Sequence, residues 1–115
     1  MRALLAALPV LLSCTSCGGP DPIVVRQQLL AGAPGEPMRV EALVENRSGG
    51  RGQVAVVADV TERGSGVLVA RESKEIEIDG HGTQGVVLEL RLPSLVDAAA
   101  RERLEVRVAA RYPID

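Results

Sequence analysis

The stretch MRVEALVEN, at positions 38–46, decides the fold class of this chain. Every second residue in it is apolar, in the series Met38, Val40, Ala42 and Val44, with Arg39, Glu41 and Glu45 on the alternate positions. Successive side chains of a β-strand point to opposite faces of its sheet. The alternation therefore predicts a strand with one buried and one solvated face.

The same alternation returns in the segments QVAVVADVTE (53–62), KEIEID (74–79), VVLELRL (86–92) and LEVRVAARY (104–112). Two weaker strands are expected at 23–31 and 67–73. Glycine-rich stretches suited to turns lie at 46–52, 63–66 and 79–82. This spacing is typical of an antiparallel sandwich with about seven strands.

One segment departs from the alternation. PSLVDAAARER, from Pro93 to Arg103, contains Ser94 and Asp97 at a spacing similar to a capping box, followed by a run of alanines. It predicts a short helix before the last strand. The expected fold class is all-β, a small immunoglobulin-like antiparallel β-sandwich over residues 23–115.

Composition excludes several classes of function. The chain has 115 residues, enough for one domain, and a net charge of −2, which offers no footprint for a nucleic-acid backbone. Aromatic residues make up 1% of the chain, and Tyr112 is the sole member of the class. The chain therefore lacks the aromatic platforms on which sugars or unstacked bases are usually bound.

The amino-terminal segment combines Arg2, an apolar run from Ala3 to Leu12 and small residues around Cys14. A transmembrane helix needs about 20 apolar residues, so this run is too short to span a membrane. A positive start, a short apolar region and small residues at the end are typical of a secretory signal.

The tetrad Leu11-Leu12-Ser13-Cys14 resembles the lipobox of bacterial lipoproteins. The resemblance implies cleavage before Cys14, a diacylglycerol thioether on its sulfur and acylation of the new amino group. One acyl chain gives only marginal membrane binding, so several chains are needed for a stable anchor. The resemblance implies a signal peptide at 1–13, a lipidated flexible tether at 14–22 and a cell-envelope location.

The residue after Cys14 is Thr15 and not Asp. By resemblance to the enterobacterial sorting rule, this favours the outer membrane, facing the periplasm. Cys14 and Cys17 also spell C-x-x-C, but no βαβ pattern follows and His81 is far away in the sequence. No metal or cofactor is expected, and Cys17 remains a free thiol or a fallback lipidation site.

A second resemblance covers roughly Pro37 to Leu92. The strand 40–46 ending in Asn46, a glycine-rich turn and the strand 53–56 look like the core of small bacterial envelope domains of the FxLYD and CARDB type. This resemblance implies an architecture and a location, and it carries no mechanism.

Catalysis is not expected. His81 stands between two glycines in a turn, without a neighbouring nucleophile, and acidic residues lie along outward strand faces. The G-x-G-x-x-G spacing at 80–85 precedes a strand, whereas a dinucleotide site requires a helix there.

After nucleic acids, sugars and catalysis, the remaining class of function is binding to a protein partner. Leu43, Val57 and Val87, together with Ala55 and Ala109, fall on faces that otherwise carry charges. Gathered on one sheet they would form an aliphatic docking patch, and the alternative is that they pack under the helix or a neighbouring loop. The expected function is that of a non-catalytic, membrane-anchored accessory or interaction module. The alternatives are a spacer without a specific partner, or an inhibitor or ligand-binding lipoprotein.

Overall fold

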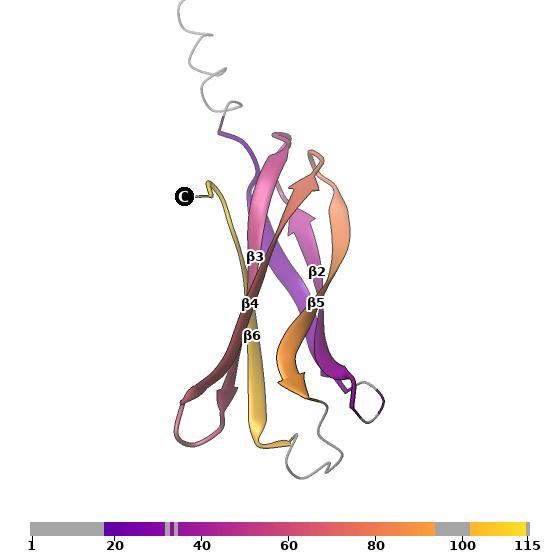
Figure 1. Ribbon diagram of the computed structural model, residues 1–115. Helices are drawn as coiled ribbons and strands as arrows, with labels where there is room; N and C mark the ends of the chain where they lie inside the picture. The colour runs from indigo at the N-terminus through magenta and orange to yellow at the C-terminus, as the bar shows by residue number, and fades with distance from the viewer. Residues whose placement is uncertain (1–17, 32, 34, 94–101, 115) are drawn as a thin grey trace, which may run out of the picture.

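The computed structural model describes residues 18–31, 33, 35–93 and 102–114. The strands of that part of the chain are β1 (Pro22–Leu30), β2 (Pro37–Asn46), β3 (Gly52–Glu62), β4 (Leu68–Ile78), β5 (Thr83–Pro93) and β6 (Leu104–Arg111). They form two three-stranded antiparallel sheets, in the orders β1-β2-β5 and β4-β3-β6. Figure 1 shows the two sheets as facing layers, so the predicted all-β sandwich is confirmed.

The core follows the predicted alternation. Along β3 the side chains at every second position from Val54 to Val60 are buried, and those between them are partly exposed. Val40 and Val44 of β2 and Leu88 of β5 meet them from the other sheet. Since full burial of a Val or Leu side chain contributes about 1.5–3 kcal/mol, this aliphatic set supplies the main driving force for packing the two layers.

The predicted number of strands is wrong by one. The strands expected at 67–73 and 74–79 are a single strand, β4. The alternation fails in the first half of this strand, and the structure gives the reason. Glu72 and Lys74 pair with buried Ala58 and Val56, so they lie on the inner-face register of an edge strand. Charged residues on that register obscure the pattern without interrupting the strand.

The predicted helix over 93–103 falls largely on residues 94–101, which lie outside the described residues. Its first residue, Pro93, is the last residue of β5. The predicted signal peptide at 1–13 and Cys14 also lie outside the described residues.

The two sheets are joined along one side by Gln27 of β1. This residue pairs with buried Ala42 and so lies on the inner-face register. Its Nε2 donates a hydrogen bond to the carbonyl oxygen of Val106 at 2.8 Å, and its Oε1 accepts one from the amide of Val108 at 2.9 Å. The Gln27 amide thus pairs with β6 much as a neighbouring strand would.

Candidate functional site

The predicted partner-binding residues are divided between the two outer faces. Leu43 of β2 and Val87 of β5 belong to the β1-β2-β5 sheet, while Val57 of β3 belongs to the β4-β3-β6 sheet. Ala55 and Ala109 accompany Val57. A single patch containing all of them does not form, and each outer face carries a small apolar group of its own.

The outer face of β1-β2-β5 is hollowed beside Leu43. Leu43 pairs with Arg26 on one side and with Gly85 on the other. Because a side chain at Gly85 would meet nothing within 4 Å, the glycine leaves open space next to the leucine. The hollow has a volume of 290 Å³, and Glu41 and Val87 also line it. Its lining combines aliphatic residues with one guanidinium, one carboxylate and the glutamines Gln27 and Gln28.

The outer face of β4-β3-β6 is lined by small residues at its middle. Val57 lies between Ser73 of β4 and Ala109 of β6. A second hollow, of 310 Å³, lies beside them, and its lining includes Arg111 and Ile114. The two hollows resemble each other in size and in their mixture of aliphatic and charged linings.

A charge ladder crosses the same face. Asp59 of β3 pairs with Arg71 of β4 and with Arg107 of β6. Arg71 Nε and Nη2 donate hydrogen bonds to the two Asp59 oxygens at 2.6 and 3.0 Å. These hydrogen bonds lower the pKa of the Asp59 carboxyl below its ordinary value, partial burial opposes the shift, and the same contacts raise the pKa of Arg71. The arrangement is a structural ion pair, because an acid held ionised by a guanidinium is a poor proton carrier at neutral pH.

Among the described residues, the side chain with the most hydrogen bonds is that of Asn46, which is 1% exposed. Its Oδ1 accepts hydrogen bonds from the amide of Asp21 at 2.9 Å and from the amide and hydroxyl of Ser48. Its Nδ2 donates to the carbonyl oxygens of Gly50 and Asp79 at 2.8 and 3.0 Å. One amide therefore joins the incoming chain, the β2–β3 turn and the β4–β5 turn.

Glycines allow these segments to meet. A side chain on Gly50 would lie 2.7 Å from the carbonyl oxygen of Gly19, and one on Gly80 would collide with the carbonyl group of Gly49. The Tyr112 ring covers Gly19, whose positive φ of 77° favours glycine. We call this region, Gly19–Asp21 with 46–52, 79–82 and Tyr112, the Asn46 end of the sandwich.

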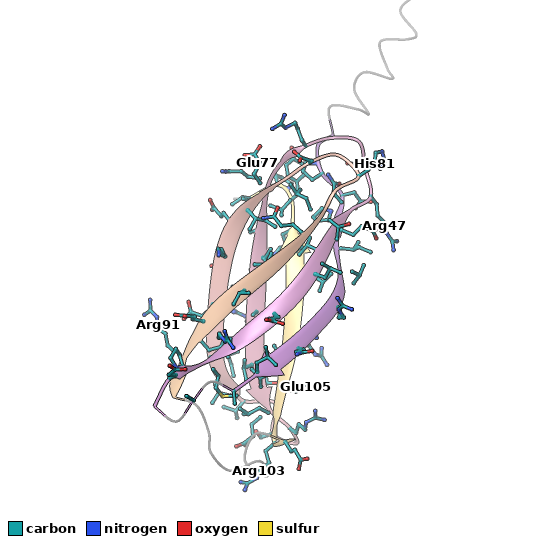
Figure 2. All side chains as sticks on the ribbon, turned by 90° about the vertical axis from the view of Figure 1, so that its right-hand side faces the viewer. Arg47, Glu77, His81, Arg91, Arg103 and Glu105 are labelled. Carbon is teal, nitrogen blue, oxygen red and sulfur yellow. The ribbon has the colours of Figure 1, made fainter. Side chains whose placement is uncertain are left out.

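His81 lies at the Asn46 end in the left-handed backbone region, at φ 54°, and is exposed. Its amide donates to the carbonyl oxygen of Ser48 at 2.8 Å. In Figure 2 its side chain is at the outside of the turn, at the same end as Glu77. The geometry gives His81 a backbone role in the turn.

The hydrogen-bonding roles of two residues were not predicted from the sequence. Asn46 and Gln27 are polar residues on inward-facing positions, and Asn46 directly continues the series Val40, Ala42, Val44. A polar residue on an inward-facing position is the sequence signal that would have marked them. Asn46 is buried and must find hydrogen-bond partners inside the fold, whereas Gln27 is exposed at the edge of its sheet and bonds the backbone of β6.

The described residues contain no group of three or more His, Cys, Asp or Glu side chains positioned to hold a metal ion. Within the same residues, no helix is long and apolar enough to cross a membrane.

Comparisons with known proteins bear on the fold. No family model and no curated protein matches the chain. Among solved structures, it is similar to a beta-glucuronidase from glycoside hydrolase family 2, with a TM-score of 0.53 and 18% identity over 62% of this chain and 8% of that chain. It is also similar to a glycosyl hydrolase family 2 member from Bacteroides cellulosilyticus DSM 14838, with a TM-score of 0.56 and 14% identity over 84% of this chain and 13% of that chain. Because the identity is low and the chain spans only a small part of either protein, the likeness concerns the fold and not the reaction.

Proposed function

We propose that this protein is a lipid-anchored lipoprotein of the bacterial cell envelope, and that its immunoglobulin-like sandwich is a non-catalytic interaction or accessory module. The observation that carries the proposal is the tetrad Leu11-Leu12-Ser13-Cys14 directly upstream of a sandwich of this kind. Acylation of Cys14 would hold the domain at a membrane surface, and Thr15 in the following position favours the outer membrane.

The way the chain joins the domain supports an anchoring role. Ser48 Oγ donates to the carbonyl oxygen of Gly19 at 2.7 Å, the Arg47 amide donates to the carbonyl oxygen of Asp21 at 3.0 Å, and Pro20 is buried. The bonded domain thus begins at Gly19, five residues after Cys14. Five extended residues reach at most about 18 Å. An anchor at Cys14 would therefore keep the Asn46 end close to the lipid and leave both outer faces accessible.

The surfaces favour contact over chemistry. Each outer face has a hollow whose lining mixes aliphatic and charged residues, beside Leu43 on one face and beside Val57 on the other. The Asp59 carboxyl, whose pKa is lowered, is already paired with Arg71. Small apolar groups with a polar rim are the usual core of a protein–protein contact.

The anchor is tested by the intact mass of the protein extracted from membranes. A chain that begins at Cys14 and carries diacylglycerol and acyl mass supports the proposal. The variant Cys14→Ser should release the protein from the membrane fraction, whereas the matched variant Cys17→Ser should leave it there. An unmodified, freely soluble wild-type chain would overturn the proposal.

The interaction role is tested by placing a photo-crosslinking residue at Val87 on one outer face and at Val57 on the other, in cells. A discrete adduct from one face, absent from the other, supports a specific partner on that face. The absence of an adduct from both positions favours the alternative, a spacer without a specific partner.

A further inference from the structure

β4 has an unpaired edge. Within the part of the chain that the structure describes, β4 is hydrogen-bonded to β3 alone, and β6 is the other edge of the same sheet. The edge of β6 is capped by side chains, because Gln27 binds the backbone of Val106 and Val108 and Arg63 Nε donates to the carbonyl oxygen of Leu104 at 3.3 Å. No side-chain hydrogen bond among the described residues caps β4 in this way. Its free amide and carbonyl groups can therefore accept another strand.

The charges at the middle of β4 are self-complementary. Residues 71–75 read RESKE. A basic residue followed by an acidic one precedes Ser73, and a basic residue followed by an acidic one comes after it. When such a strand meets its own copy in the antiparallel direction with Ser73 at the centre, Arg71 faces Glu75 and Glu72 faces Lys74. A two-fold axis repeats each pair, so four opposite-charge pairs form.

Within this segment, only Ser73 at the centre satisfies the charges. Directly opposed residues in an antiparallel pair must point to the same face of the sheet, so a two-fold axis places one residue opposite its own copy. If that residue were Arg71, Glu72, Lys74 or Glu75, two like charges would lie against each other. Like charges directly opposite are destabilising, whereas opposite charges stabilise the pair. Ser73 is the one neutral residue of the five.

We propose that this protein forms a symmetric homodimer in which the free edges of two β4 strands pair in the antiparallel direction about Ser73. The β4-β3-β6 sheet of one copy then continues into the same sheet of the second copy, and the six strands follow the order β6-β3-β4-β4-β3-β6. This inference depends on β4 and its neighbours and goes beyond the lipid anchor, so it holds whether or not Cys14 is acylated.

The rows of side chains on the outer face agree with this pairing. One row continues from Arg107 through Asp59 and Arg71 to Glu75 of the second copy, so the charges alternate across the junction. The neighbouring row runs from Ala109 through Val57 to Ser73 and then to Ser73 of the second copy, so small side chains meet at the axis. The ion pair of Glu72 with Arg91, at 3.3 Å, does not oppose the pairing, because the Arg91 side chain is 91% exposed and free to move.

Disulfide trapping of the full-length chain tests the geometry. In a Cys17→Ser background, Ser73→Cys should give a disulfide-linked dimer on mild oxidation of the cells that produce it, because directly opposed Cα atoms in an antiparallel pair lie within disulfide range. The matched control is Glu77→Cys, exposed on the same strand but separated from its copy by eight residues, or about 27 Å. Absence of a dimer with Ser73→Cys, or equal crosslinking at both positions, would overturn the proposal.

Charge reversal tests the register independently. Adding Lys74→Glu to Ser73→Cys places a glutamate opposite Glu72 of the second copy, so association should weaken at least about tenfold and the crosslink yield should fall accordingly. Adding Glu72→Lys as well should then restore the yield, because each lysine again faces a glutamate. A yield that Lys74→Glu leaves unchanged, or that Glu72→Lys fails to restore, contradicts pairing about Ser73.

Discussion

The two ends of the sandwich are built on different principles. At the Asn46 end, one buried amide and a set of close backbone contacts tie together segments from residues 19–21, 46–52 and 79–82. The opposite end, which we call the hairpin end, carries the β3–β4 turn at 63–67 and the exposed side chains of Val67, Leu68 and Val69. Figure 2 separates the ends clearly, with His81 at the first and Arg103 at the second.

This contrast teaches where the sequence is constrained. At the Asn46 end, backbone groups of three segments depend on one side chain for their hydrogen bonds, and the close approach of the turns depends on glycines. Within the described residues, the hairpin end has no such central side chain: the turn is held by local bonds, such as Gly66 amide to Glu62 carbonyl at 2.8 Å and Glu62 amide to Val67 carbonyl at 2.9 Å. Two bonds from Arg63, to the carbonyl oxygens of Arg103 at 2.7 Å and Leu104 at 3.3 Å, join the turn to the start of β6. Substitutions should therefore be costly at the first end and nearly neutral at the second.

The largest effect is expected for Asn46→Ala. The substitution removes the partner of the Asp21 amide and of the Gly50 carbonyl group at a part-buried position. The Asp79 carbonyl group loses one of two partners and keeps the Gly82 amide at 3.0 Å. Unsatisfied buried polar groups cost about 1–3 kcal/mol each, partly relieved by water entry, so we expect a loss of about 3 kcal/mol in the free energy of unfolding. Urea unfolding followed by far-UV circular dichroism measures it.

The neighbouring variant Arg47→Ala is the control for Asn46→Ala. The Arg47 side chain forms an exposed ion pair with Glu45 at 3.5 Å, so its removal should change stability by less than about 0.5 kcal/mol. Equal losses for the two variants would show that the Asn46 amide is not the centre of this end.

The next largest effect is expected for Gly80→Ala, which would push a methyl group into the Gly49 carbonyl. Forcing extra atoms into a packed site typically costs about 1–3 kcal/mol, so we expect about 2 kcal/mol. Gly85→Ala is the matched variant, because a methyl group there would have no neighbour within 4 Å. Gly85 also has no positive φ that would strain an alanine. It should leave stability unchanged or raise it slightly.

The tyrosine adds a local readout for the same pair of variants. Tyr112 is the one aromatic residue of the chain and its ring covers Gly19, so its fluorescence reports on the Asn46 end. In Gly80→Ala the tyrosine signal should change before the circular dichroism signal as urea rises. Coincident transitions would mean that the end does not loosen separately.

Much of the fold was accessible from the sequence, for a physical reason. A period of two fixes which face each side chain takes, so the buried series through Val40, Val44, Val54 and Val60 was predicted correctly. The same period does not say which strands are neighbours. Sequence alone therefore could not separate Leu43 from Val57, although the two residues belong to different sheets.

The Asn46 contacts lay beyond the reach of a local pattern. The side chain bonds groups at residues 21 and 79, which are 25 and 33 positions away in the chain. Such contacts arise only when the turns have been brought together by strand packing. The merger of two predicted strands into β4 has a similar origin, because Glu72 and Lys74 take an inner register at a sheet edge where charge is tolerated.

The Asp59–Arg71 pair of the charge ladder is expected to contribute less to the free energy of unfolding than the contacts of the Asn46 end. Hydrogen bonds from Arg71 lower the pKa of Asp59 in the folded state, so their stabilisation is complete above the unfolded pKa of about 3.9 and is lost as the pH falls through the folded pKa. The Asp59 side chain is 32% exposed and solvent screens the pair, so the contribution should be below about 1 kcal/mol.

The measurement for Asp59 is the change in urea midpoint between neutral pH and a pH about one unit below the unfolded pKa. Asp59→Asn should show a smaller loss on acidification than the wild type, and molar salt should reduce the difference between them. An equal loss in both proteins would mean that the Asp59–Arg71 pair contributes nothing measurable to folding.

The smallest effect is expected at the hairpin end, for Val67→Thr. The Val67 side chain is 58% exposed, so exchanging a methyl group for a hydroxyl of similar shape buries no polar group and should change the free energy of unfolding by less than about 0.5 kcal/mol. The same exchange at Val60, which is 0% exposed near the end of β3, places a hydroxyl in the aliphatic core and should cost about 2 kcal/mol. Since β3 and β4 form one hairpin, this pair of variants compares burial directly at nearly the same height in the sandwich. A cost at Val67 that approached the cost at Val60 would mean that the three aliphatic residues of the hairpin end are covered in the folded protein, and the contrast between the two ends would then fail.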